Sequence, residues 1–188
     1  MTKKLPKIIT QEEFEKIFTY TIRSKKKNKK AYALAMLLGF EAGMRISEIV
    51  GLSFPPIKGS TVGVNKVPAL TKDKVSLEQN TIRIESGKGN KDRIVPLPKR
   101  FNNAALNLLP IPLSRRSLQQ YVTDVGLEVL EKHITFHVLR HGFGSHLAAS
   151  GRPIHEIQML MGHSRLETTG IYLHANPKTA IDGARDVF

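Results

Sequence analysis

The stretch at residues 136–151, FHVLRHGFGSHLAASG, carries the most information about this chain's fold, and its pattern predicts a helix over residues 136–150. Within it His137 and Arg140 are three residues apart, so both side chains leave the same face of a helix. A guanidinium beside an imidazole suits a phosphate, because the guanidinium fork binds two nonbridging oxygens at once. The same spacing also occurs in ordinary surface His–Arg pairs, so this pattern alone indicates only a candidate anion site.

Toward the C-terminus, residues 161–174 read MGHSRLETTGIYLH and follow a predicted helix over residues 154–161. His163 and Tyr172 would face opposite sides of one continuous helix, so a shared site requires a turn, which Gly162 and Ser164 predict before a further helix over residues 167–174. A tyrosine hydroxyl, with a pKa of about 10, is a poor nucleophile unless nearby cations stabilise its anion. The alternative is that Tyr172 is a half-buried aromatic.

Upstream of residue 136, two short alternating segments over residues 81–85 and 93–97 flank a glycine-rich turn, which predicts a β-hairpin. The flanking glycines leave the Lys88 side chain able to reach a ligand. The Gly-Lys pair resembles a fragment of an NTP-binding loop, but the full GxxxxGK[ST] pattern is absent and no helix follows. A plain charged turn is the alternative.

Further upstream, residues 42–52 read AGMRISEIVGL, where Gly43 ends a buried apolar helix over residues 31–42 and Arg45 opens a short helix over residues 45–52. The helix macrodipole does not favour a cation at a helix start. A bound oxyanion would explain Arg45 there, whereas the alternative is an exposed arginine.

The remaining pattern is mostly helical. Thr10 and Glu13 form a capping-box signature before a helix that runs to about Arg23, and a further helix begins after Ser114. Residues 55–75 are rich in glycine and proline and predict a loop. No repeat or dividing linker is visible, so we predict a single α+β domain over residues 1–188, mainly α-helical with a small antiparallel sheet.

Composition points to a polyanionic partner. The chain has 29 Lys and Arg against 16 Asp and Glu, a formal charge of +13, and many of the cations lie in the run Arg23–Lys30. The alternatives are a merely soluble basic protein or one that touches acidic lipid. Without cysteines, disulfides and thiolate chemistry are excluded. No apolar run approaches the roughly 18 residues of a membrane span, so we expect a cytoplasmic protein with no membrane partner.

Taken together and in this order, the motifs resemble the tyrosine recombinase and phage integrase family. The likeness runs from about Leu5 to Tyr172 and is most specific in "AGMRISEIVGL", "SGKGNKDRIVPLP", "FHVLRHGFGSHLAASG" and "MGHSRLETTGIYLH". It implies the family's catalytic-domain fold and a site-specific recombinase that breaks and rejoins double-stranded DNA without a cofactor or metal ion, as a homo-oligomer on the DNA.

The resemblance also implies roles for individual residues. Arg45 and Arg140 would hold the scissile phosphate, with Glu48 orienting its neighbours. Tyr172 would attack to give a 3′-phosphotyrosine, and Lys88 would protonate the leaving 5′ hydroxyl, although nearby Lys91 is an alternative acid. His137 would serve proton transfer and His163 would bind a nonbridging oxygen. DNA contacts are expected from Lys25, Lys26, Lys27, Lys29, Lys30, Lys91 and Arg93.

The chain departs from the family pattern in three places. The N-terminal clamp domain of relatives is not expected here, residues 55–70 look like an inserted loop, and Gly170 weakens the predicted helix before Tyr172. The tail over residues 175–188 is expected to dock on a neighbouring protomer. Two rival functions stay open, a type IB topoisomerase-like strand transferase and a non-catalytic DNA-binding remnant.

Overall fold

The computed structural model describes residues 8–52, 67–85 and 92–162. In these ranges the elements are, in order, α1 (Gln11–Arg23), α2 (Lys29–Glu41), α3 (Ile46–Val50), the 3-10 helix η1 (Lys72–Lys74), β1 (Val75–Ser76), β2 (Thr81–Ile84), β3 (Arg93–Pro96), α4 (Asn103–Leu106), α5 (Arg115–Leu130), α6 (Phe136–Ala149) and α7 (Ile154–Met161). The predicted class is therefore confirmed: the domain is mainly helical with a small antiparallel sheet.

Helix α2 is the centre of the hydrophobic core. Every residue from Ala31 to Phe40 is buried, because this helix is apolar on all sides and is packed by α1, α3, α5 and α6. Phe40 stacks on Phe14 of α1 with ring centroids 4.1 Å apart. The predicted buried helix is confirmed, although it begins two residues earlier than expected, at Lys29.

The N-terminal start of α1 is fixed locally. The Glu13 backbone N–H donates to Thr10 Oγ1 at 3.2 Å, and the Thr10 N–H donates to Glu13 Oε2 at 3.1 Å. This reciprocal pair is the predicted capping box, and it satisfies two backbone donors that the first helical turn leaves without partners.

The sheet has strand order β1–β2–β3 and is antiparallel throughout. In the predicted hairpin, Ile82 pairs with Val95 and Arg83 with Ile94, so buried and exposed residues alternate along both strands. Strand β1 and helix α4 were not predicted, because two and four residues are too short to show a period.

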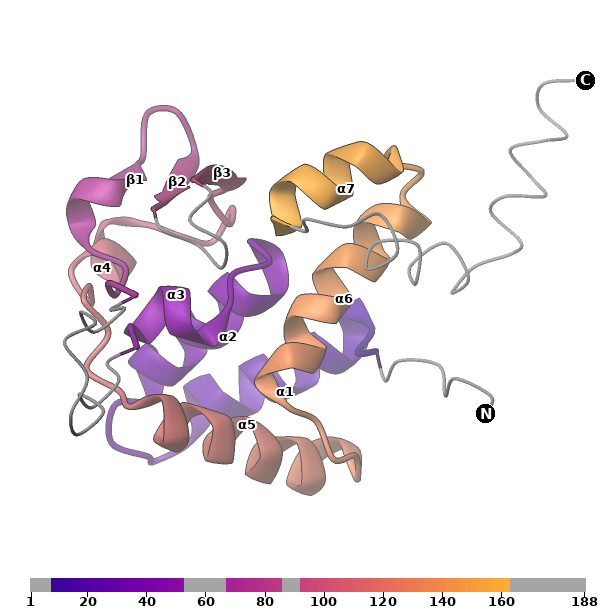
Figure 1. Ribbon diagram of the computed structural model, residues 1–188. Coiled ribbons are helices and arrows are strands. Elements are labelled where there is room, and N and C mark those ends of the chain that lie inside the picture. Colours follow the sequence, from indigo (N-terminus) through magenta and orange to yellow (C-terminus); the bar gives the residue numbers. More distant parts are fainter. Residues whose placement is uncertain (1–7, 53–66, 86–91, 163–188) are drawn as a thin grey trace, which may run out of the picture.

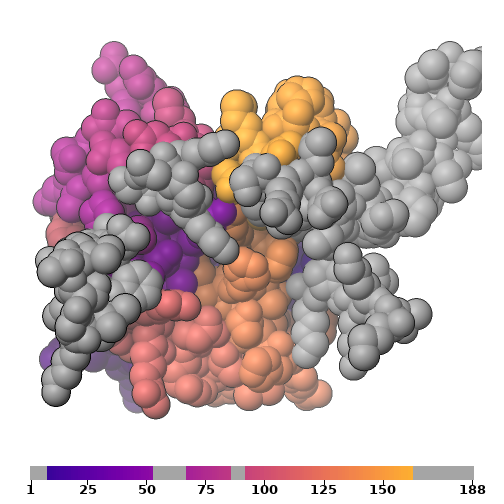
Figure 2. Space-filling model, viewed as in Figure 1, coloured from indigo at the N-terminus to yellow at the C-terminus, as the bar shows by residue number. Residues whose placement is uncertain are grey.

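The arrangement of the elements brings distant segments together. Figure 1 shows the sheet and α7 at one end of the molecule and α5 at the other, with α3 and α6 between them. In the space-filling view of Figure 2 the sheet and α7 lie side by side, and β3 contacts α7. These contacts assemble the site described below.

Some predictions fall outside the described residues. The helix over residues 167–174 and the tail over residues 175–188 lie there, as does most of the predicted inserted loop, although Val67 is described and forms a β-bridge with Leu52. Within the described ranges, no helix combines the length and the apolar character that crossing a membrane would require.

Candidate active site

Arg45 lies directly before α3, where the backbone turns out of α2 into the new helix. Its backbone N–H donates to Glu48 Oε2 at 2.7 Å, and its Nη1 donates to Glu48 Oε1 at 2.8 Å. Glu48 is the third residue of α3, so its carboxylate closes the helix start as in a capping box. The sequence suggested that a bound anion would be needed to explain Arg45 at this helix start. Glu48 supplies that negative charge from within the protein.

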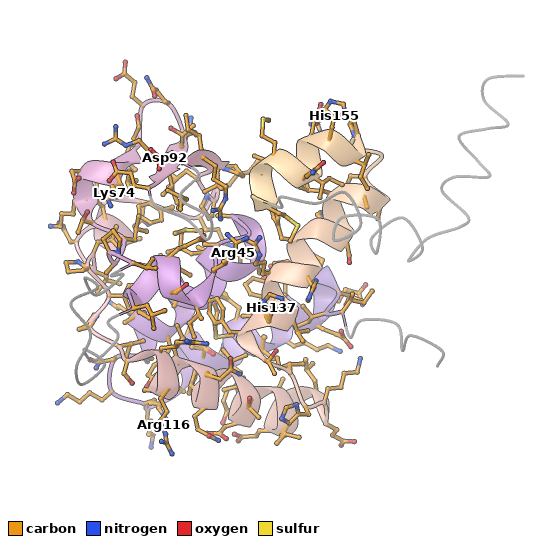
Figure 3. All side chains as sticks on the ribbon, viewed as in Figure 1. Arg45, Lys74, Asp92, Arg116, His137 and His155 are labelled. Carbon is orange, nitrogen blue, oxygen red and sulfur yellow. The ribbon has the colours of Figure 1, made fainter. Side chains whose placement is uncertain are left out.

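The guanidinium of Arg140 is buried, with 2% of the residue exposed, and points from α6 into the interior. It donates to the carbonyl of Gly43 through Nη1 and to the carbonyl of Met161 through Nη2. Arg45 reaches the same place, because its Nη2 lies 3.3 Å from Met161 O and 3.0 Å from Gly162 O. The two arginines that the resemblance assigns to the scissile phosphate thus meet at one backbone carbonyl (Figure 3 labels Arg45).

The position of this meeting point explains how it can hold two cations. Met161 is the last residue of α7, and the last carbonyls of a helix lack partners inside it and carry the negative end of the macrodipole. Gly162 ends α7 with φ +60°, a left-handed conformation that suits glycine. The predicted turn at Gly162 is confirmed, and it directly precedes His163 in the sequence.

The other carbonyl bound by Arg140 depends on a close contact between α2 and α6. Gly43 has φ +62°, and a Cβ atom there would lie 2.4 Å from the Phe143 ring. Only a residue without a side chain therefore lets the end of α2 close onto α6 at this point. The predicted helix end at Gly43 is confirmed, and the closure puts its carbonyl within reach of Arg140.

Glu48 is also bound by a third arginine. Arg93 Nη1 donates to Glu48 Oε1 and Arg93 Nη2 to Glu48 Oε2, both at 2.8 Å, and the residues are 9% and 4% exposed. Burial by itself raises the pKa of Glu48, but hydrogen bonds and charge from Arg93 and then Arg45 outweigh it and lower that pKa from 4.5 to about 2. Glu48 is therefore an anion at any physiological pH.

The placement of Arg93 corrects one expectation from the sequence. We expected a DNA contact, whereas its guanidinium is buried and bound to Glu48 and, through Nε at 2.9 Å, to the carbonyl of Leu160. The alternation of buried and exposed residues along β3 could have predicted that Arg93 is buried. Arg93 has the same parity as buried Val95, while the intervening Ile94 is 60% exposed.

His137 and His141 lie one turn apart on α6. The ring of His137, an exposed residue, meets the half-buried His141 ring edge-on, with centroids 4.5 Å apart and an interplanar angle of 88°. Burial, followed by the positive charges of His137 and Arg140, lowers the pKa of His141 from 6.5 to about 4. His141 was not singled out from the sequence, and it presents an uncharged ring to His137 at neutral pH.

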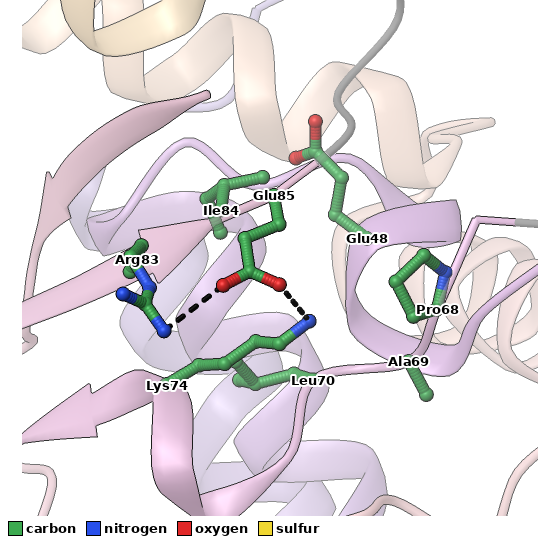
Figure 4. Close-up of a pocket in the computed structure, with 8 residues that line it drawn as sticks. All are labelled: Glu48, Pro68, Ala69, Leu70, Lys74, Arg83, Ile84 and Glu85. Carbon is green, nitrogen blue, oxygen red and sulfur yellow. Dashed lines mark ion pairs between the residues drawn. The ribbon is translucent and has the colours of Figure 1, made fainter. Parts of the chain in front are cut away.

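A second ion-pair cluster, also missed by the sequence analysis, anchors the other strand of the hairpin. Glu85 binds Lys74 Nζ at 3.2 Å and Arg83 Nη2 at 2.9 Å, at the end of the described residues that follow β2. Figure 4 shows these three residues on one side of a small hollow, while the Glu48 carboxylate points away from them. The two strands of the hairpin are thus tied to the domain by separate carboxylates.

The lysine run is mostly solvent-exposed, as expected of a solvated charged segment. Lys25, Lys27 and Lys30 are exposed. Lys26 lies over the rings of Tyr32 and Tyr121, at 5.5 and 4.9 Å from their centroids. Lys29 donates from Nζ to the carbonyl of Ser24 at 2.9 Å. Because Lys26 and Lys29 have these contacts within the protein, Lys25, Lys27 and Lys30 are the better candidates for phosphate contacts.

Four expected site residues, Lys88, Lys91, His163 and Tyr172, lie outside the described residues. The structure brings together Arg45, Glu48 and Arg140, and it describes the two strands that flank Lys88. In the described part of the chain, no group of three His, Asp or Glu side chains has an arrangement that could hold a metal ion.

Comparison with solved structures identifies the class of fold. XerA recombinase superposes with a TM-score of 0.71 at 20% identity, covering 97% of this chain and 66% of that one. The catalytic domain of bacteriophage HP1 integrase superposes with a TM-score of 0.60 at 22% identity, covering 95% and 93%. The fold is therefore that of a tyrosine recombinase catalytic domain.

Sequence comparison gives the relatives that this chain resembles. Residues 106–179 match the model described as the phage integrase family. The chain is 32% identical over 192 residues to tyrosine recombinase XerA of Thermococcus kodakarensis, covering 90% of this chain and 58% of that protein. It is 29% identical over 216 residues to tyrosine recombinase XerD of Halalkalibacterium halodurans, covering 100% and 62%. The chain is therefore similar to tyrosine recombinases, matches the phage integrase family over residues 106–179, and spans about six tenths of the length of these relatives.

Proposed function

We propose that this chain is the catalytic domain of a site-specific DNA recombinase, which cleaves and rejoins strands through a 3′-phosphotyrosine at Tyr172. The observation that carries the proposal is the meeting of Arg45 and Arg140 at the Met161 carbonyl, two residues before His163. The match of residues 106–179 to the phage integrase family and the similarity to tyrosine recombinases support it.

In this proposal the two arginines bind the phosphate whose bond is broken. Attack on a phosphodiester builds negative charge on the nonbridging oxygens, and fixed cations in a low-dielectric site stabilise that charge without reorganising. The Arg45 side chain keeps 20% of its surface exposed while its guanidinium is held by Glu48 and the end of α7. A guanidinium has five N–H donors, which is enough to bind these internal acceptors and a phosphate together.

The bond changes balance without a cofactor. The Tyr172 oxygen forms a bond to phosphorus, the bond from phosphorus to the 5′ oxygen breaks, and Lys88 protonates that oxygen as it leaves, with Lys91 as the alternative acid. His137 serves proton transfer by accepting the proton that the Tyr172 hydroxyl loses, and His163 binds a nonbridging oxygen. The phosphotyrosine ester keeps the energy of the broken bond, so attack by a 5′ hydroxyl reverses the step and rejoins a strand without ATP.

Double-stranded DNA is the proposed partner. A fold neighbour, the XerH site-specific recombinase, is described in complex with its difH substrate, at a TM-score of 0.71 and 24% identity. The excess of basic residues, 29 Lys and Arg against 16 Asp and Glu, supports a polyanionic ligand, with Lys25, Lys27 and Lys30 as phosphate contacts. We further propose a homo-oligomer on DNA, in which the tail over residues 175–188 docks on the neighbouring protomer.

Covalent trapping tests the proposed function. The protein is mixed with nicked duplexes that carry candidate sites, in low salt and EDTA, and the products are separated under denaturing conditions. We expect a protein–DNA adduct that is lost in Tyr172→Phe, because phenylalanine lacks the attacking oxygen. Tyr32→Phe is a matched control, since Tyr32 is buried in the core beside Ser117 and should leave adduct formation intact.

The other outcomes separate the rival functions. Salt-sensitive DNA binding without any adduct would support a binding remnant and count against catalysis. An adduct accompanied by relaxation of supercoiled plasmid, but by no exchange between two sites, would favour a topoisomerase-like strand transferase. Absence of DNA binding would overturn the whole proposal.

A further inference from the structure

Arg93 stands at the junction of three elements. It is the first residue of β3, and its guanidinium binds Glu48 of α3 twice at 2.8 Å. Its Nε donates to the carbonyl of Leu160, near the end of α7, at 2.9 Å. Arg93 therefore ties the hairpin strand, the start of α3 and the end of α7 to one another.

The hydrogen bonds around Arg93 close into a ring with those of Arg45. Each Glu48 oxygen accepts from both arginines: Oε1 from the two Nη1 atoms, and Oε2 from Arg93 Nη2 and the Arg45 backbone N–H. Arg45 then returns to α7 through Gly162 O at 3.0 Å, two residues beyond the carbonyl that Arg93 holds. Because the ring is closed, a shift of Arg93 must displace Arg45 or the end of α7.

Packing supports the same connection. A Cβ atom on Gly162 would lie 3.0 Å from Arg93 Cδ and 3.3 Å from its Nε, so the Arg93 side chain lies directly against the turn that ends α7. That turn also carries the carbonyls bound by Arg45 and Arg140. Arg93 therefore limits where the turn can lie.

Stability alone does not account for this buried pair. Two ionised groups are costly to desolvate, and well-packed apolar residues of similar volume usually stabilise a core at least as well. A planar guanidinium that binds both carboxylate oxygens does fix orientation, which an apolar contact would not. The arrangement thus suits a requirement for geometry.

We propose that Arg93 is a positioning residue that acts through Glu48 and the end of α7 to set Arg45 and the Met161–Gly162 carbonyls in register for phosphate binding, without itself touching DNA. The proposal rests on the proposed function, since it concerns the same site. It predicts that changing Arg93 disorders the guanidinium groups of Arg45 and Arg140 and slows cleavage, while DNA is bound nearly as well.

The first test observes the arginines directly and needs no catalysis. In ¹⁵N NMR of the full chain, the side-chain N–H signals of Arg45 and Arg140 should be dispersed by their fixed partners. In Arg93→Lys, which keeps the charge but loses the fork, both should move toward the positions of exposed arginines. Amide signals of α1 and α5 should stay in place, which shows that the domain is folded.

The second test separates binding from cleavage. At saturating nicked duplex, Arg93→Lys should form the covalent adduct about 10²-fold more slowly, because small misplacement of reacting groups has effects of this size. The DNA concentration for half-saturation should change by less than about threefold, since phosphate contacts on the surface dominate affinity. Arg83→Lys is the matched control, because Arg83 is an exposed arginine on the adjacent strand and should change neither quantity.

The outcomes distinguish this proposal from the proposed function. Arg45 and Arg140 signals that stay unchanged in Arg93→Lys would overturn the positioning role, whatever the activity. An equal loss of binding and cleavage would also overturn it, as it would indicate a general structural defect. Signals displaced in Arg93→Lys, together with a wild-type protein that forms no adduct, would support positioning and count against catalysis. If Arg93→Lys does not fold, Glu48→Gln breaks the same ring and takes its place.

Discussion

At the scale of single residues, the central fact is that two arginines distant in sequence share one carbonyl. Met161 is 116 residues from Arg45 and 21 from Arg140. Two guanidinium groups repel each other in a low-dielectric interior, so their approach requires compensation. It comes from the anionic Glu48 and from the negative end of α7. A phosphate arriving at this place would add further negative charge where the positive charge is in excess.

One prediction concerns the Arg45 fork. In Arg45→Lys the charge remains, but a lysine cannot bind Glu48, the end of α7 and a phosphate together. We expect adduct formation at saturating DNA to slow by about 10²- to 10³-fold, the usual effect of losing one donor to a transition-state oxyanion. Arg152→Lys, at an exposed arginine before α7, is the control, and a rate as fast as wild type in Arg45→Lys would contradict the assignment.

A second prediction concerns the pH dependence of stability. The pKa of Glu48 is about 2 in the folded chain against an ordinary 4.5, so its contribution is fully present above pH 4.5 and is lost as the pH falls toward 2. The difference in free energy of unfolding between wild type and Glu48→Gln should therefore shrink by on the order of 3 kcal/mol over that interval. Urea unfolding at several pH values measures it.

The control for that measurement is Glu78→Gln, at an exposed position in the connection between β1 and β2. A substitution at an exposed position away from the core usually changes stability by less than about 0.5 kcal/mol. A wild-type advantage over Glu48→Gln that stayed constant down to pH 2 would show that the charge of Glu48 does not stabilise the fold.

At the scale of elements, the site depends on how α2, α3 and α7 end or begin. Gly43 ends the α2 segment against α6, Glu48 caps the start of α3, and Gly162 ends α7 in a left-handed turn. Each of these termini exposes backbone groups that a continuous helix would have used internally. The arginines bind those groups, so the helix ends themselves form part of the site.

A third prediction tests the junction of α2 with α6. Gly43→Ala must adopt φ +62° and also place its Cβ 2.4 Å from Phe143, whereas Gly151→Ala adopts φ +74° with nothing within 4 Å. We expect a loss of about 1 kcal/mol for Gly151→Ala from the backbone alone, and about 2–4 kcal/mol for Gly43→Ala, where overpacking is added. Equal losses in chemical denaturation would show that the contact with α6 is not tight.

At the scale of the whole molecule, the formal charge of +13 is far larger than the net charge of the candidate site, which holds three arginines and one glutamate. Arg93 and Arg140 are buried and Arg45 is partly buried, whereas Lys25 and Lys27 are exposed in the connection between α1 and α2 and Lys30 is exposed at the start of α2. Surface cations of this kind contact phosphates, release counterions and carry little sequence preference. In the proposed function, the charges at the site act on the scissile phosphate, whereas the surface charges contribute to DNA binding.

A fourth prediction follows for salt dependence. Replacing Lys25, Lys27 and Lys30 by Gln should reduce the slope of log affinity against log salt by about 3, because each phosphate contact contributes about 0.9. A control variant carries the same charge change at three scattered exposed lysines, Lys72, Lys99 and Lys132. If both variants change the slope equally, net charge matters and the lysine run is no binding surface.

Much of the fold was determined by the sequence alone. The capping box before α1, the apolar run of α2, the alternation in the hairpin and the glycines at positions 43 and 162 are local signals, and each predicted an element or its end. They succeed because helix periods, caps and left-handed turns are set by residues within a few positions of one another. The roles proposed for Arg45, Glu48 and Arg140 came instead from the resemblance of the ordered motifs to the tyrosine recombinase family.

Only the tertiary structure decided what these residues bind. Arg93 was expected to contact DNA and instead binds Glu48, 45 residues away, and Met161 was given no role at the site because its contribution is a backbone carbonyl. A buried guanidinium takes whichever acceptors the packing of helices and strands brings within hydrogen-bond distance. That choice depends on long-range contacts, which local periodicity does not encode, and it is why the partners of the three arginines required the folded chain.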